Sequence, residues 1–377
     1  MDMAEPKHIV FVTEHLSFGG AEVVLTTYLK SIDPNRYKIS LIVRDGRGAE
    51  NYLLKEVPPH IHVQTLFDQT EIKSHSCHFR AKFAKRFDEA VDSLGKVDVI
   101  VDFSPVLDKI IYRLKKRKMI LWMHGDKSHM GFWERLKYRL RIRQYDKIVL
   151  LCNEMKDQFQ SIFPELQDKL CIIPNPFDFD KILAKSTEES DLSVGDRKLM
   201  SETYIVSVAR LVPGKDFKTI IEAGRILKER GYSYKHYIIG DGELREELQS
   251  LIDKYGLNNQ IFLLGAKQNP YPWMKKADFF VHSANREGFG LAIVEAMYLG
   301  KAVIATRCPV GPAEILQDGK AGLLFPLNDA DVLAGHIANY IDDLDKRRHF
   351  SEVSQQRARD FSSDRILPLL YRVLDSV

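Results

Sequence analysis

Two successive series of short apolar segments constrain the fold of this chain most strongly. The first series contains "HIVFVT", "YKISLIVRD", "VDVIVDF", "KMILWMH" and "DKIVLLCN", and the second contains "TYIVSVARL", "KHYIIGDG", "QIFLLG", "DFFVHSA" and "AVIATR". The segments are apolar without alternation and are separated by stretches with helical spacing, as in parallel strands that are covered on both faces. Each series therefore predicts a doubly wound, Rossmann-like α/β domain.

The length of 377 residues also favours two domains, since a single core rarely grows that large. We place the first domain at residues 1–180 and the second at 200–364. Between them, the tract from Lys181 to Glu202 is polar and poor in aromatic residues, which is typical of a surface connection. Two doubly wound domains facing each other would place a ligand cleft between the carboxyl ends of their strands.

The composition is that of a folded protein, with 45% apolar and 28% charged residues. The N-terminal residues include acids where a signal peptide carries bases, and no stretch is long enough to span a membrane. The four cysteines, Cys77, Cys152, Cys171 and Cys308, form no CxxC pair, and no histidine or cysteine spacing indicates zinc. We therefore expect reduced thiols, no metal and a cytoplasmic location.

The stretch "REGFGLAIVEAM" carries two acids, Glu287 and Glu295, around the start of a predicted helix from about Leu291 to Leu299. Gly288 and Gly290 precede this helix, so the backbone amides of residues 289 to 291 are free to hold a phosphate. An alternative stays open, in which Glu287 is a solvated loop acid and Glu295 a surface residue. However, an acid among the apolar neighbours of Glu295 is costly unless it has a partner.

Two cations, Arg210 and Lys215, lie in "VARLVPGKDF" just after a predicted strand. Cations on a turn at the end of a strand suit a pyrophosphate group. Taken alone, the motif is better explained by a solvated turn. Nearby, Gly240 and Gly242 in "IIGDGE" form a glycine pair that ordinary turn chemistry also explains.

In the first domain, "SFGGAE" places Gly19 and Gly20 after the first predicted strand. The G-x-G-x-x-G pattern of dinucleotide-binding domains is missing, and Asp45 is only a loose candidate for the acid that accompanies it. This argues against a nicotinamide enzyme. His124, in "MILWMHGDK", follows an apolar strand and is either a site residue or a structural histidine.

The motif "EGFGLAIVEA", with two glutamates separated by seven residues, resembles the signature of retaining glycosyltransferases of family 4, which have the GT-B fold. The resemblance covers nearly the whole chain and is strongest from Thr203 to Pro326. It implies that Glu295 holds the ribose hydroxyls of a nucleotide and that Glu287 contacts the donor sugar. It further implies that the final helix, residues 365–377, returns to the first domain.

The resemblance also assigns the other candidate residues. It implies a catalytic set of His124, Arg210, Lys215 and Glu287. It implies a donor-binding set of Gly19, Gly20, Gly240, Gly242, Gly288, Phe289, Gly290, Leu291 and Glu295. In this family, the cations and the helix N-terminus stabilise the departing diphosphate without metal, and the acceptor attacks from the face that the leaving group occupies.

The activity that the resemblance implies is transfer of a sugar from a UDP- or GDP-sugar to an acceptor hydroxyl with retained configuration. Assembly of bacterial polysaccharide or of a lipid-linked glycan is the expected pathway. The alternatives are a sugar phosphorylase, which would need pyridoxal phosphate on a lysine, and a non-catalytic two-lobed sugar-binding protein. Asp178 and Asp180 have the D-x-D spacing of metal-dependent transferases, but we interpret Asp178 as a turn residue.

Basic residues are concentrated in the first domain, in the tracts 78–86, 113–118 and 133–143. In the last tract, cations alternate with apolar residues, so its period fits a strand, whereas a helix would place Trp133, Leu136 and Leu140 on one side and Tyr138 and Ile142 on another. A solvated helix explains the tract. The alternative is a surface for anionic lipid on the inner face of the cell membrane, or for a lipid-linked acceptor. No nucleic-acid partner is expected.

Overall fold

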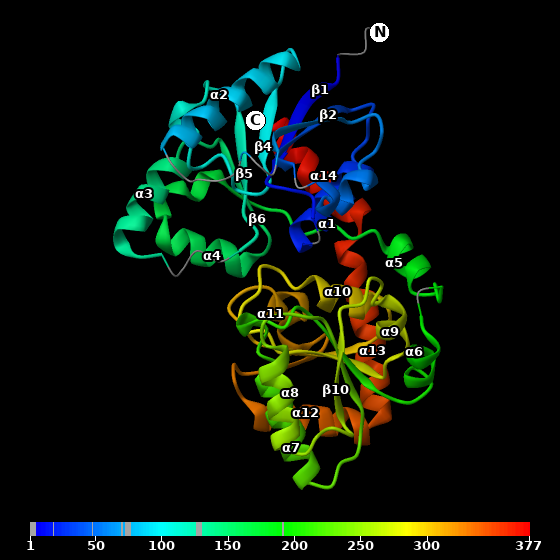
Figure 1. Ribbon diagram of the computed structural model, residues 1–377. Coiled ribbons are helices and arrows are strands. Elements are labelled where there is room, and N and C mark those ends of the chain that lie inside the picture. The colour runs from blue at the N-terminus through cyan, green and yellow to red at the C-terminus, as the bar shows by residue number, and fades with distance from the viewer. Residues whose placement is uncertain are drawn as a thin grey trace. The chain divides into compact units, whose positions relative to one another are not determined.

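The computed structural model describes residues 5–17, 19–46, 48–68, 71, 77–125, 130–190 and 192–377. The chain divides into two compact units. Unit 1 comprises Met1–Phe177 and Ser363–Val377, and unit 2 comprises Asp178–Ser362. Figure 1 shows the elements of both units coloured in chain order.

Unit 1 is built on a parallel sheet with the strand order β3-β2-β1-β4-β5-β6-β7. Its strands are β1 (Lys7–Thr13), β2 (Tyr37–Gly46), β3 (His62–Asp68), β4 (Val99–Asp102), β5 (Met119–Trp122), β6 (Lys147–Leu150) and β7 (Leu170–Ile172). Every residue of β1 after the first is buried, because helices cover both faces of the sheet. The unbroken apolar runs in the sequence follow from this double cover.

The helices of unit 1 include one from the far end of the chain. They are α1 (Gly20–Ser31), α2 (Cys77–Ser93), α3 (Phe132–Ile142), α4 (Asn153–Ile162) and α14 (Ser363–Asp375). Figure 1 shows α14, in red, beside the blue helix α1, and the two helices are in contact. Lys7 Nζ donates to the Leu374 carbonyl oxygen at 2.6 Å, and the Tyr37 hydroxyl donates to Asp375 Oδ1 at 2.6 Å. These bonds hold the last helix to the first strands.

Unit 2 has a second parallel sheet, with the order β10-β9-β8-β11-β12-β13. Its strands are β8 (Ile205–Val208), β9 (His236–Ile239), β10 (Ile261–Gly265), β11 (Phe279–His282), β12 (Ala302–Thr306) and β13 (Leu323–Phe325). The chain starts at β8 and builds outward through β9 and β10. It then returns to the other side of β8 with β11, so the winding reverses between β8 and β11.

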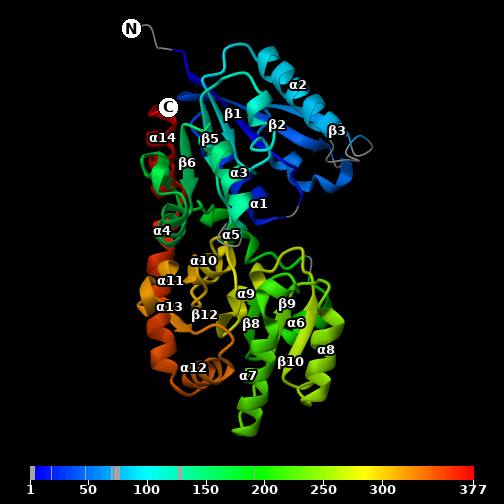
Figure 2. The same cartoon turned by 90° about the vertical axis from the view of Figure 1, so that its left-hand side faces the viewer.

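Helices cover both faces of the unit 2 sheet. They are α5 (Phe179–Lys185), α6 (Val194–Leu199), α7 (Phe217–Glu229), α8 (Arg245–Lys254), α9 (Tyr271–Lys276), α10 (Leu291–Tyr298), α11 (Pro312–Ile315), α12 (Ala330–Asp342) and α13 (Leu344–Ala358). In Figure 1, α7, α8 and α12 lie on one side of the sheet and α9 and α13 on the other. Apolar residues of α7, α8 and α12 pack in one core with strands β8 to β12, and α8 contacts β10 (Figure 2).

Some local predictions differ from the structure. The polar tract from Lys181 to Glu202, interpreted as a surface connection, instead contributes to α5 and α6 of unit 2. Ser193 and Asp196 form a reciprocal cap at the start of α6, and Asp196 pairs with Lys267 at 2.7 Å. The polar composition of this tract is therefore that of two short helices with polar caps. Asp178, interpreted as a turn residue, caps α5 by accepting from Lys181 N at 2.9 Å.

The ambiguous tract 133–143 belongs to the helix α3, as the helical alternative has it. Tyr138 and Ile142 are buried, whereas Trp133, Leu136 and Leu140 are exposed. Throughout the described part of the chain, no helix is both long and apolar enough to cross a membrane.

Candidate active site

The loops that follow β8 and β11 meet at the carboxyl edge of the unit 2 sheet. These strands are neighbours, and the chain leaves them toward opposite sides of the sheet, which opens space above the edge. Two hydrogen bonds tie the loops together. Ser283 Oγ donates to the Lys215 carbonyl oxygen at 2.9 Å, and Asn285 N donates to the Gly214 carbonyl oxygen at 3.0 Å. The loops that carry the predicted residues Lys215 and Glu287 are therefore fixed relative to each other.

Lys215 and Glu287 form an ion pair through Lys215 Nζ and Glu287 Oε1. A third residue, His282 at the end of β11, places its Nε2 atom 2.8 Å from the same carboxylate oxygen. Burial alone would raise the pKa of the Glu287 carboxyl, but the contacts with His282 and Lys215 outweigh burial and hold the pKa at about 2. Glu287 is therefore a fixed anion and not the solvated loop acid of the alternative interpretation.

Glu295 lies on α10 among the buried residues Ile293, Val294, Ala296 and Met297. Its Oε1 accepts a hydrogen bond from the Tyr271 hydroxyl at 3.0 Å. Burial raises the pKa of the Glu295 carboxyl to about 7, and the bond from Tyr271 opposes that shift only in part. The two acids of one motif thus differ in ionisation: Glu287 stays charged across the neutral range, whereas Glu295 titrates within it.

The N-terminus of α10 begins at the left-handed residue Gly290, which has φ 109°. A side chain is disfavoured at this φ, so glycine is needed for the chain to turn into the helix. Within the described residues, the N–H groups of Gly290, Leu291 and Ala292 donate no hydrogen bond to backbone or side chain. Such groups, at the positive end of a helix dipole, suit an anion. Gly288 precedes them, and the ring of Phe289 is buried against Phe361.

Arg210, in the loop after β8, is exposed, and its guanidinium has no ion pair with any residue that the structure describes. Gly240 and Gly242 pack against this loop. A Cβ atom at Gly240 would lie 1.8 Å from the Ala209 carbonyl oxygen, and one at Gly242 would lie 2.5 Å from the Leu211 carbonyl oxygen. Close backbone approach therefore explains both glycines, and their predicted contact with a donor stays a prediction.

In unit 1, Gly19 and Gly20 lie at the start of α1, directly after the loop from β1. Glu22 folds back over this helix N-terminus: a Cβ atom at Gly19 would lie 2.1 Å from Glu22 Oε2. Glu22 is 9% exposed, and its Oε1 lies 3.5 Å from His15 Nδ1. An acid thus lies over the helix start at Gly19 and Gly20, which the prediction includes in the donor-binding set.

His124 follows β5, and its Nε2 lies 2.9 Å from the Phe103 carbonyl oxygen. A carbonyl oxygen only accepts, so Nε2 carries the proton and Nδ1 is left as an acceptor. Desolvation lowers the pKa of His124 to about 4, and the bond to Phe103 offsets only part of that shift. The ring is therefore neutral at pH 7 and can accept one hydrogen bond through Nδ1.

Two family models match successive parts of the chain. The model described as Glycosyltransferase Family 4 matches residues 18–181, and the model described as Glycosyl transferases group 1 matches residues 194–357. Together they cover most of both units, including every predicted site residue. The chain belongs to glycosyltransferase family 4.

Relatives of the glycosyltransferase support this assignment. An uncharacterized glycosyltransferase of Methanocaldococcus jannaschii is 29% identical over 308 residues, which cover 72% of this chain and 75% of the relative. An N-acetylgalactosamine-N,N'-diacetylbacillosaminyl-diphospho-undecaprenol 4-alpha-N-acetylgalactosaminyltransferase of Campylobacter jejuni is 28% identical over 225 residues, 59% of each protein.

Solved structures show the same fold. The glycosyltransferase matches Anabaena Alr3699/HepE in complex with UDP with a TM-score of 0.77 and 22% identity, over 98% of this chain and 100% of that one. It matches a Rickettsia africae glycosyltransferase with a TM-score of 0.78 and 18% identity, over 99% of each chain. The predicted GT-B fold, with two Rossmann-like domains, is confirmed.

Two residues of the glycosyltransferase site were not predicted from the sequence. His282 ends β11, and Tyr271 begins α9. His282 could have been found from the sequence, because an imidazole at the carboxyl end of an apolar strand lies where parallel strands place their ligands. Nothing local marks Tyr271, whose partner Glu295 is 24 positions away.

Many cations in the basic tracts of the glycosyltransferase pair with acids of unit 1, and three of these acids each serve two cations. Glu71 pairs with Lys82 and Arg86, Asp92 pairs with Lys115 and Arg117, and Glu165 pairs with Arg139 and Arg143. The α3 helix, by contrast, exposes large apolar side chains: Phe132 is 74% and Trp133 71% exposed, and Leu136 and Leu140 are exposed as well. This surface therefore combines large exposed apolar side chains with cations.

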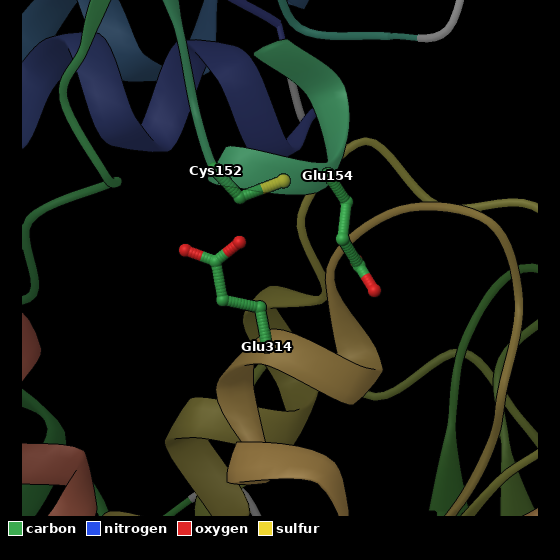
Figure 3. A group of neighbouring side chains, drawn as sticks. All are labelled: Cys152, Glu154 and Glu314. Atoms are coloured by element: carbon green, nitrogen blue, oxygen red, sulfur yellow. The ribbon is translucent and has the colours of Figure 1, made fainter. Parts of the chain in front are cut away.

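Three further side chains of the types that bind metals are drawn in Figure 3. Cys152 and Glu154 lie at the start of α4 in unit 1, whereas Glu314 lies on α11 in unit 2. Because they belong to separate units, we build no metal site from them.

Proposed function

We propose that this glycosyltransferase moves a sugar from a UDP- or GDP-sugar to an acceptor hydroxyl with retention of the anomeric configuration. One observation carries the proposal. A lysine, two acids with different ionisation and the free amides at the start of α10 all lie in or directly after the loops at the carboxyl edge of one sheet, where its winding reverses. That set matches the parts of a nucleotide-sugar: a diphosphate, ribose hydroxyls and sugar hydroxyls.

The proposed roles follow from charge. Lys215, Arg210 and the amides of residues 290 to 292 face the diphosphate, which gains negative charge as the bond to the sugar breaks. Glu295 accepts from the ribose hydroxyls, and Glu287 accepts from a hydroxyl of the donor sugar through Oε2. The departing phosphate oxygen takes the proton of the acceptor hydroxyl, which attacks from the same face. His124 offers Nδ1 as an acceptor for the donor sugar.

We further propose that no metal ion takes part, because the cations and the helix dipole supply the positive charge that a metal would supply. The experiment is a screen of UDP- and GDP-sugars for thermal stabilisation, followed by turnover of the best one with and without EDTA. Turnover that survives EDTA and yields a retained anomeric signal by NMR is expected. Strict dependence on added magnesium or manganese, or an inverted product, would contradict the proposal.

The acceptor is proposed to be a lipid-linked glycan at an anionic membrane surface. The Campylobacter relative is named for a sugar linked to diphospho-undecaprenol. The exposed side chains of Phe132 and Trp133, next to the cations of α3, suit insertion at the interface of a bilayer.

Sedimentation with anionic vesicles tests this surface. The double variant Phe132→Ser/Trp133→Ser is expected to stay in the supernatant while the wild type pellets. Val194→Ser, which alters an apolar residue of unit 2 that is 83% exposed, serves as the control. Equal pelleting of all three proteins would leave α3 as a solvated helix.

A further inference from the structure

We propose that His282 replaces Lys215 as the partner of Glu287 when the donor diphosphate binds, and that His282 is therefore a positioning residue for the sugar-contacting acid. This inference rests on the proposed function and adds a residue that the paired-glutamate motif does not contain. Two nitrogen atoms, Lys215 Nζ and His282 Nε2, share one carboxylate oxygen of Glu287.

Both Lys215 Nζ and His282 Nε2 approach Glu287 Oε1, and no described residue forms a hydrogen bond or ion pair with Glu287 Oε2. The second oxygen is therefore available to a sugar hydroxyl, while the first anchors the side chain. A carboxylate that is 11% exposed needs such an anchor, because a buried charge without a partner is strongly disfavoured.

Lys215 has two competing tasks. Without ligand, its ammonium group pairs with Glu287. In the proposed complex it neutralises the diphosphate, which carries more charge than one carboxylate and attracts the ammonium more strongly. As Lys215 turns toward the phosphate, its hold on Oε1 weakens, and Glu287 would become free to move unless another donor held it.

His282 is placed to be that donor. Its side chain is 5% exposed, its ring stacks near Phe280 with centroids 6.4 Å apart, and its carbonyl oxygen accepts from Thr306 Oγ1 at 3.2 Å. Although Nε2 lies 2.8 Å from Oε1, it makes no aligned hydrogen bond. A buried nitrogen left without such a bond is rare, and a small rotation of the carboxylate away from Lys215 would satisfy it.

Steady-state kinetics of two variants test the inference. His282→Leu keeps bulk but removes the donor, whereas the amide nitrogen of His282→Gln reaches about as far as Nε2. We expect His282→Leu to lose about tenfold or more in kcat, as for loss of a hydrogen bond to a charged group. We expect His282→Gln to recover most of that loss. UDP carries the diphosphate that draws Lys215 away from Glu287, so the Kd of UDP should also rise in His282→Leu and return toward the wild-type value in His282→Gln.

A double-variant cycle separates positioning from a general structural effect. In a Glu287→Ala background, His282→Leu should cost nothing further, because the oxygen that His282 would hold is already gone. Additive losses in that background, equal losses in the Leu and Gln variants, or a His282→Leu enzyme as fast as the wild type would each overturn the inference. If the Leu variant does not fold, His282→Asn replaces it, since its shorter amide does not reach Oε1. A wild-type protein that binds no nucleotide-sugar would refute the proposed function itself.

Discussion

At the carboxyl ends of β8 and β11, unit 2 places Lys215 and His282 beside the same carboxylate oxygen of Glu287. At the matching strands of unit 1, β1 and β4, the sheet order also reverses, but the chemistry differs. Gly19 and Gly20 follow β1, and the acid Glu22 lies over the helix that they begin. His124, after the next strand, is neutral at pH 7.

The two units therefore share a fold and differ in fixed charge. The site of unit 2 offers cations and free helix amides, which suit a ligand that always carries a diphosphate. The corresponding edge of unit 1 offers an acid and a neutral imidazole, which suit hydroxyl groups better than phosphate. The shared topology determines where a ligand binds, whereas the loop residues determine which charge the ligand must carry.

The largest effect should come from removing the cation of unit 2. Lys215→Ala is expected to lower kcat/KM about 100-fold or more, because a preorganised charge that faces the leaving group is lost. Lys320→Ala is the matched control, since Lys320 precedes β13 and so lies toward the amino edge of the same sheet. Steady-state kinetics measure both variants. Equal activity of the two would show that the charge comparison between the units is mistaken.

The pH dependence of nucleotide affinity should sharpen the comparison. The pKa of Glu295 is about 7 because of burial, and ribose hydroxyls bind its ionised form. Affinity should therefore be highest above pH 7, and the Kd for UDP or GDP should rise about tenfold for each pH unit below it. Calorimetry on Glu295→Gln isolates this effect, because the phosphate of the ligand titrates equally in both experiments. The same slope in both proteins would remove Glu295 from the site.

A smaller effect is expected in unit 1. His124→Phe removes the Nδ1 acceptor and should lower kcat/KM about tenfold, the value of one neutral hydrogen bond in a dry site, with UDP affinity unchanged. His15→Phe, a histidine substitution near Gly19, provides a comparison within the same unit. If His124→Phe weakened UDP binding as much as turnover, the neutral histidine would belong to nucleotide recognition, and the contrast between the units would disappear.

Much of the fold followed from the sequence because parallel strands covered on both faces leave unbroken apolar runs. The helix α10 was predicted within one residue, since Gly290 and the apolar run mark its limits. Strands β3, β7 and β13 went unrecognised. All three are edge strands of their sheets, where the apolar runs are short or mixed with polar residues.

The site was predictable in part. Lys215 and Glu287 were singled out separately, but their ion pair joins residues 72 positions apart and depends on β8 lying beside β11. The role of Tyr271 depends in the same way on where α9 packs. Local sequence patterns thus identified the charged candidate residues. Only the fold shows which of these residues pair with each other. The basic tracts illustrate the same point, because their acidic partners lie elsewhere in the chain.

Hydrogen–deuterium exchange with and without UDP or GDP tests the central claim most directly, because it reports where the nucleotide is held. We expect slower exchange in two segments of unit 2, residues 209–216 and 287–298, which carry the cations, the acids and the α10 amides. Protection confined to unit 1, or found in unit 2 only outside these two loops, would contradict the assignment of the nucleotide to this sheet edge.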